Sequence, residues 1–132
     1  MDPREFGAAG LARAIRVRDF TVTDVVDSHI ELIERVNPGL NAVVTTMFDP
    51  ARAQAGAADD QIDREGTDSL PPLFGVPVTV KDCWPVEGVR FTSGSWHHRD
   101  DVAGPDAITV TRLKDAGAII LGKTNCPDMC WG

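Results

Sequence analysis

The 132-residue sequence has no long apolar segment and no excess of basic residues, and both absences restrict its function. Thirteen Lys and Arg residues are scattered among twenty Asp and Glu residues, which gives a net charge of −7. Nucleic acids and anionic membrane surfaces bind clustered basic side chains, so neither is expected as a partner. No apolar run reaches membrane-spanning length, and the first residues lack the basic and apolar regions of a signal peptide.

Cysteine is also scarce, and no internal repeat is apparent. Three cysteines, an odd number, favour a reducing cytoplasm over a disulfide scaffold. Hydrophobic content of 42% and charged content of 25% are typical of a soluble globular protein. The length suits one ordinary domain, so we expect residues 1–132 to form a single cytoplasmic unit.

Three segments have the spacing of apolar residues that is typical of helices. The first covers residues 7–18. The second opens at a capping box made by Thr21 and Asp24, and Asn37-Pro38-Gly39 is expected to end it. In the third, which runs from Asp49 to about Glu65, Asp49 is expected to cap the helix and Pro50 to occupy its first position.

The stretch Pro71–Asp82, PPLFGVPVTVKD, predicts a strand with a functional residue at its end. Valines alternate along it and stop at Lys81-Asp82. An ammonium group at the end of an apolar strand is poorly hydrated, and burial lowers the pKa of lysine readily, which suits Lys81 to act as a general base. The alternative is that Lys81 extends into water and pairs with Asp82.

A second strand completes a β-α-β unit, and Leu40–Phe48 adds a further strand rich in β-branched residues. After an irregular stretch, Cys83–Pro105, Asp106 is expected to cap a helix that ends at Ala116, and Ala118–Leu121 reads as a buried strand. Such units pair their strands in parallel. An α/β fold is therefore predicted, with Lys81-Asp82 and Lys123-Thr124-Asn125 meeting at one sheet edge.

Two motifs suggest other chemistry and are rejected on their context. Gly117–Thr124, GAIILGKT, matches the phosphate-loop pattern, but its four intervening residues read as the strand itself and no helix follows. The cysteines at 126 and 130, with His97 and His98, do not have the spacing of a zinc site. His29 lies on the apolar side of its helix and is interpreted as a packed histidine. No cofactor and no metal is expected.

Several separated runs together resemble the amino-terminal part of the amidase signature family. They are Glu34–Val43 (ERVNPGLNAV), PLFGVPVTVKD, Phe91–Ser95 (FTSGS) and Asp106–Met129 (DAITVTRLKDAGAIILGKTNCPDM), in the order and spacing of the family. The resemblance implies an incomplete portion of that fold, a mixed sheet with flanking helices. It also implies a small-molecule amide substrate, and a homodimer is compatible with a full-length enzyme of this family.

The resemblance assigns Lys81 as the base of a Ser-Ser-Lys triad that hydrolyses carboxamides to a carboxylate and ammonia or an amine. The lysine must be neutral to accept a proton, so a desolvated site is expected around it. The two serines of the family lie in a Gly- and Ser-rich segment beyond this chain, and Ser95 matches a position near the site, not the nucleophile. The chain alone is therefore expected to be inactive.

Two alternatives remain open from the sequence. One is the glutamine-hydrolysing subunit of an amidotransferase of the same family. The other is a non-catalytic remnant or binding module that keeps the β-α-β scaffold. The ending Asp128-Met129-Cys130 also differs from the Glu-Phe type that is common in the family.

Overall fold

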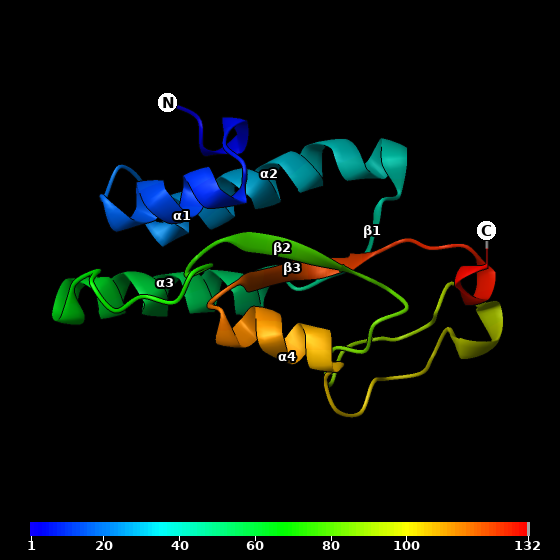
Figure 1. The fold of residues 1–132 in the computed structure, drawn as a ribbon. Helices are drawn as coiled ribbons and strands as arrows, with labels where there is room; N and C mark the ends of the chain where they lie inside the picture. Colours follow the sequence, from blue (N-terminus) through cyan, green and yellow to red (C-terminus); the bar gives the residue numbers. More distant parts are fainter. Residues whose placement is uncertain (132) are drawn as a thin grey trace.

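A computed structural model describes residues 1–131 and shows a mixed α/β fold (Figure 1). In chain order its elements are the 3-10 helix η1 (Pro3–Glu5), α1 (Ala8–Arg16), α2 (Val22–Leu40), β1 (Val43–Thr46), α3 (Phe48–Glu65), β2 (Pro77–Lys81), the 3-10 helix η2 (Trp96–His98), α4 (Ile108–Asp115), β3 (Ile119–Thr124) and the 3-10 helix η3 (Asp128–Cys130). No helix within these residues is both long enough and apolar enough to cross a membrane.

The three strands form one sheet in the order β1-β3-β2. β2 and β3 are parallel and are joined through α4, which confirms the predicted β-α-β unit. β1 pairs with the other edge of β3 in the antiparallel direction, so the sheet is mixed, as the resemblance implied. β2 and β1 are thus the two edge strands.

Helices cover both faces of the sheet (Figure 1). α1 and α2 lie along one side and α4 lies along the other, while α3 packs against α2 and β3. One buried cluster joins α1, α2 and α3 to Val76, Ile119 and Leu121. A second cluster joins α4 to the opposite face of the strands through Val80 and Ile120. The alternation of side chains along a strand produces these two separate cores.

Gly75 allows the sheet to approach α2 closely. Its φ is +75°, and a Cβ atom built on it would lie 2.7 Å from Cγ2 of Val22, the first residue of α2. The capping box at the start of that helix is confirmed, because Thr21 accepts from the Asp24 backbone N–H and Asp24 accepts from that of Thr21. The local sequence therefore sets both where α2 begins and how near it comes to the sheet.

The predicted end of α2 was wrong. The helix continues through Pro38 to Leu40, and Asn41 ends it in the left-handed conformation. The Asn41 N–H still reaches the Asn37 carbonyl oxygen at 2.7 Å. The Asn37 side chain accepts from the Val43 N–H and donates to the Val43 carbonyl oxygen, which ties this last turn to β1. Tertiary hydrogen bonds thus hold a helical turn that its proline and glycine disfavour.

The predicted aspartate caps of α3 and α4 were also wrong. Met47 precedes α3 and Ala107 precedes α4, and neither makes a side-chain cap. Asp106 instead accepts hydrogen bonds from the Glu87 backbone N–H at 2.7 Å and from Lys114 Nζ at 2.6 Å. Because both oxygens of the Asp106 carboxylate are occupied by these hydrogen bonds, the side chain does not cap α4.

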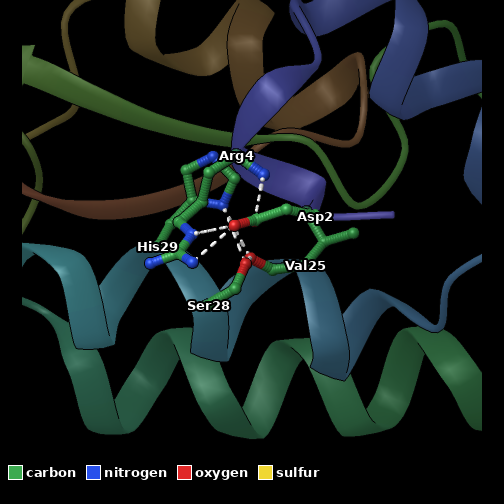
Figure 2. A network of polar contacts seen from close by, with 5 residues as sticks. All are labelled: Asp2, Arg4, Val25, Ser28 and His29. Carbon is green, nitrogen blue, oxygen red and sulfur yellow. Dashed lines mark hydrogen bonds and ion pairs between the residues drawn. The ribbon is translucent and has the colours of Figure 1, made fainter.

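Figure 2 shows the surroundings of His29. The Nδ1 atom lies 2.7 Å from the Val25 carbonyl oxygen one turn earlier in α2, and the side chain is half-buried. Nearby, Arg4 donates to Asp2, and these hydrogen bonds lower the pKa of Asp2 to about 2. His29 is therefore the packed histidine that the sequence predicted.

Candidate active site

The carboxyl ends of β2 and β3 meet at one edge of the sheet, as predicted (Figure 1). Lys81 lies opposite Thr124 in the parallel register, and the Asp82 N–H donates to the Thr124 carbonyl oxygen at 3.0 Å. The two polar clusters of the sequence are therefore neighbours. Open α/β sheets place their ligands at such an edge.

Lys81 is exposed at this edge, whereas the sequence predicted a desolvated lysine. β2 is an edge strand, so within residues 1–131 no further strand lies beyond it to cover Lys81. Asp82, which directly follows β2, is not its partner either, because its carboxylate pairs with Lys123. Lys81 thus points into water while Asp82 points into the protein.

Asp82 forms a buried ion pair with Lys123, which the sequence did not predict. Lys123 is 0% exposed and Asp82 2%, and Lys123 Nζ lies 2.8 Å from Asp82 Oδ1. The same ammonium group lies 3.5 Å from the Arg90 carbonyl oxygen and 5.4 Å from the centroid of the Phe91 ring. Two buried charges are tolerated in this way only when they are paired and hydrogen-bonded.

The other oxygen of Asp82 holds the loop that follows β2. Oδ2 accepts from the Thr92 backbone N–H at 3.2 Å and from the Thr92 hydroxyl group. The Asp82 carbonyl oxygen accepts from the Ser93 N–H at 3.1 Å. Asp82 therefore joins the FTSGS run to the end of β2, and this explains why an irregular segment has a defined position.

A hollow of about 300 Å³ lies beside this pair. Its lining includes Arg90, Thr92, Ser95, Arg99 and Asn125, together with Asp82 and residues of β1. Ser95 is buried, whereas Trp96 next to it is largely exposed and carries the Arg99 guanidinium group 4.6 Å above its ring. A larger hollow of about 500 Å³ lies between α3 and α4 and includes neither Lys81 nor Asp82.

Two of the three thiols, Cys83 and Cys130, lie near Lys81, and Cys126 lies near Cys130. Burial raises the pKa of Cys83, a hydrogen bond with Cys130 adds to that rise, and the charge of Lys81 opposes it. Burial also raises the pKa of Cys130, which interacts with Cys126 as well. Within residues 1–131, no three His, Cys, Asp or Glu side chains are arranged to hold a metal ion.

The phosphate-loop motif has no phosphate-loop structure. Gly122, Lys123 and Thr124 all belong to β3, and a Cβ atom at Gly122 would lie 2.5 Å from the Thr45 carbonyl oxygen of β1. Gly122 permits close strand pairing, and Lys123 is held in the ion pair with Asp82. An apolar run that continues directly into Gly-Lys was the available signal that the strand, and with it Lys123, is buried.

Comparison with known proteins identifies a family model and several relatives that match this chain. The Amidase family model matches residues 24–132. The chain is 43% identical over 128 residues to fatty-acid amide hydrolase 2-A of Danio rerio, and the match covers 93% of this chain and 24% of the relative. It is 42% identical over 119 residues to one subunit of the glutamyl-tRNA(Gln) amidotransferase of Koribacter versatilis, with coverage of 90% and 24%.

A solved structure of a bacterial aryl acylamidase of the amidase signature family superimposes with a TM-score of 0.85 at 30% identity. The match covers 94% of this chain and 26% of that one. The chain therefore spans about a quarter of the length of the relatives that it matches. The family model, the relatives and the fold agree, and the chain belongs to the amidase signature family.

Proposed function

We propose that this chain carries the general base, Lys81, of an amide hydrolase whose two serines are encoded beyond residue 132. The position of Lys81 supports the proposal most directly. It ends a parallel strand at the sheet edge where two polar clusters meet, in a sequence that belongs to the amidase signature family. The relatives include amide hydrolases of different substrate ranges, so the proposed reaction class is hydrolysis of a carboxamide.

In the proposed reaction, neutral Lys81 accepts a proton through a bridging serine while a second serine attacks the amide carbonyl carbon. The tetrahedral intermediate collapses, the C–N bond breaks, and the same proton reaches the departing ammonia or amine. Water then hydrolyses the acyl-serine to the carboxylic acid and restores the nucleophile. The 132-residue chain supplies the base and the strand edge that positions it.

The exposure of Lys81 bears on this proposal. Covering a lysine side chain from water disfavours its charged form. We propose that the serine-bearing segment packs over the exposed end of β2 and so desolvates Lys81. This accounts for a base on an edge strand, and it implies that the 132-residue chain has no activity alone.

The amidotransferase stays as the second candidate because identity to one of its subunits is nearly as high as identity to the hydrolase. In this candidate function the chain belongs to a subunit that hydrolyses glutamine and passes ammonia to a partner. Release of ammonia from glutamine only when a partner subunit is present would favour this candidate. Hydrolysis of simple acyl amides by one chain would favour the first.

The test begins with the gene sequence after codon 132. An in-frame Gly- and Ser-rich segment supports the proposal, whereas a native stop codon favours the non-catalytic remnant. The longer product is then assayed with acyl amides alongside the 132-residue chain. Lys81→Ala should lower kcat in the longer product by about a hundredfold or more, as expected for loss of a general base.

The matched control is Lys114→Ala, at an exposed ion pair outside the site, which should leave kcat unchanged. Turnover by the 132-residue chain that Lys81→Ala abolishes would refute the need for additional serines.

A further inference from the structure

The residue next to Lys81 is unfavourable for a lysine that has to lose its proton. Asp82 follows it directly, and a nearby carboxylate stabilises the protonated form of an amine. If Asp82 carried a free charge, it would hold Lys81 in the ammonium form. The fold has to remove this charge for Lys81 to accept a proton near neutral pH.

Lys123 supplies the opposite charge where it is needed. Its Nζ atom lies 2.8 Å from Asp82 Oδ1, and both side chains are almost fully buried. Thr92 occupies the second carboxylate oxygen through its backbone N–H and its hydroxyl group. The pair has no net charge, so Lys81 has a neutral pair beside it in place of an isolated carboxylate.

We infer that Lys123 is a positioning residue that neutralises Asp82, and so allows Lys81 to act as the base. The inference rests on the proposed function, in which Lys81 is that base. Lys123 cannot replace Lys81, because it is 0% exposed and its donors face Asp82 and the Arg90 carbonyl oxygen. The two lysines therefore have separate tasks, one of them electrostatic and structural.

Other charged and titratable groups lie on both sides of the pair. Arg90 and Arg99 line the hollow next to Asp82. The thiols of Cys83 and Cys130 lie near Lys81. Among these groups only Lys123 is in direct contact with the Asp82 carboxylate and fully removed from solvent. Removing its charge should therefore act on Lys81 through Asp82.

The sequence contains only three lysines, at positions 81, 114 and 123, so each side-chain signal can be assigned in the full 132-residue chain. NMR of isotope-labelled lysine side chains gives the midpoint of each titration. In Lys123→Gln, which keeps a hydrogen-bond donor, and in Lys123→Met, the unpaired Asp82 is ionised at the alkaline pH where lysine titrates. The pH at the midpoint of the Lys81 titration should rise by about half a unit, as expected for one nearby negative charge that has lost its neutralising partner at a water-exposed site.

The double variant Asp82→Asn/Lys123→Met removes both charges and should return the Lys81 midpoint to its parent value. Asp106→Asn is the matched control, since it removes a carboxylate that pairs with Lys114 and should move only the Lys114 midpoint. A loss of structure without an electrostatic role would not produce a rise that the double variant reverses. An unchanged Lys81 midpoint in folded Lys123→Gln or Lys123→Met would overturn the inference.

The parent chain decides the matter if both single variants unfold. A charged Lys123 ammonium group at pH 7 supports the inference, and a neutral amine at that pH overturns it. None of these readouts needs turnover. Absence of amide hydrolysis by the longer product would refute the proposed function while the lysine titrations stayed as expected, so the two failures are distinguishable.

Discussion

Lys123 and Asp82, which are 41 residues apart in the sequence, form a 2.8 Å ion pair that joins the carboxyl ends of the two parallel strands. One carboxylate oxygen faces Lys123 and the other faces Thr92. The pair thus connects both strands of the β-α-β unit to the loop after β2. Its burial makes the two partners dependent on each other.

Removing one partner of this pair should destabilise the chain strongly. Lys123→Met leaves a buried, unpaired carboxylate, and the free energy of unfolding should fall by about 3–5 kcal/mol. Asp82→Asn/Lys123→Met leaves no unpaired charge and should lose less. Urea unfolding measures these differences. Lys114→Met, at an exposed pair, is the control and should change the free energy by less than about 1 kcal/mol. Equal losses in Lys123→Met and Lys114→Met would contradict this prediction.

Gly94 should tolerate alanine far less well than Gly88 does. Both have positive φ, +72° and +74°, so both substitutions carry the same backbone strain. A Cβ atom at Gly94 would overlap the carbonyl oxygens of Cys126 and Pro127, whereas nothing lies within 4 Å at Gly88. Gly88→Ala should cost about 1 kcal/mol, and Gly94→Ala about 1–3 kcal/mol more because of the overlap. Urea unfolding of the two variants gives the two free energies of unfolding. Similar losses of free energy would show that the backbone at residues 126–127 moves aside at little cost.

Two of the thiols should react slowly with alkylating reagents in the folded chain. Burial raises the pKa of Cys83 and of Cys130, so the reactive thiolate is scarce near pH 8. Mass spectrometry of peptides after timed treatment with iodoacetamide gives the rate at each cysteine. Both rates should increase when the chain is unfolded in urea. A folded Cys83 that reacts as fast as the unfolded one would rule out this environment.

The Asp106 contacts should make stability depend on acid pH. The hydrogen bond from Lys114 and the one from the Glu87 backbone N–H lower the pKa of Asp106. A carboxyl group with a lowered folded-state pKa stabilises the fold above its unfolded pKa of about 3.9, and this contribution is lost as the pH falls through the lower folded value. Asp106→Asn should therefore be less stable than the parent at pH 6, with a smaller difference below about pH 4. Urea midpoints at both pH values test this.

The control for that experiment is Asp68→Asn, an exposed carboxylate in the turn between α3 and β2 that makes no hydrogen bond or ion pair within residues 1–131. Its difference from the parent should be small at both pH values. If Asp106→Asn behaves in the same way, the Lys114 and Glu87 contacts contribute nothing measurable to stability.

The sequence by itself determined the β-α-β unit and the meeting of its polar ends. Alternating valines before Lys81 and the apolar run before Lys123 specify two strands, and a connection that contains a helix makes them parallel. The capping box of Thr21 and Asp24 likewise fixed the start of α2. These features depend on neighbouring residues and on the handedness of the chain, so local pattern is sufficient.

Only the tertiary structure decided which charges pair and which stay in water. Asp82 could have paired with Lys81 next to it, but Lys81 is exposed and Asp82 is buried. The pairing of β2 with β3 brings Lys123 to Asp82 from the neighbouring strand. Asp106 could have capped α4, but its carboxylate accepts hydrogen bonds from the Glu87 backbone N–H and from Lys114 instead. The exposure of Lys81 depends in the same way on what covers an edge strand. Such outcomes are set by distances between segments far apart in sequence, and the order of residues along the chain does not contain them.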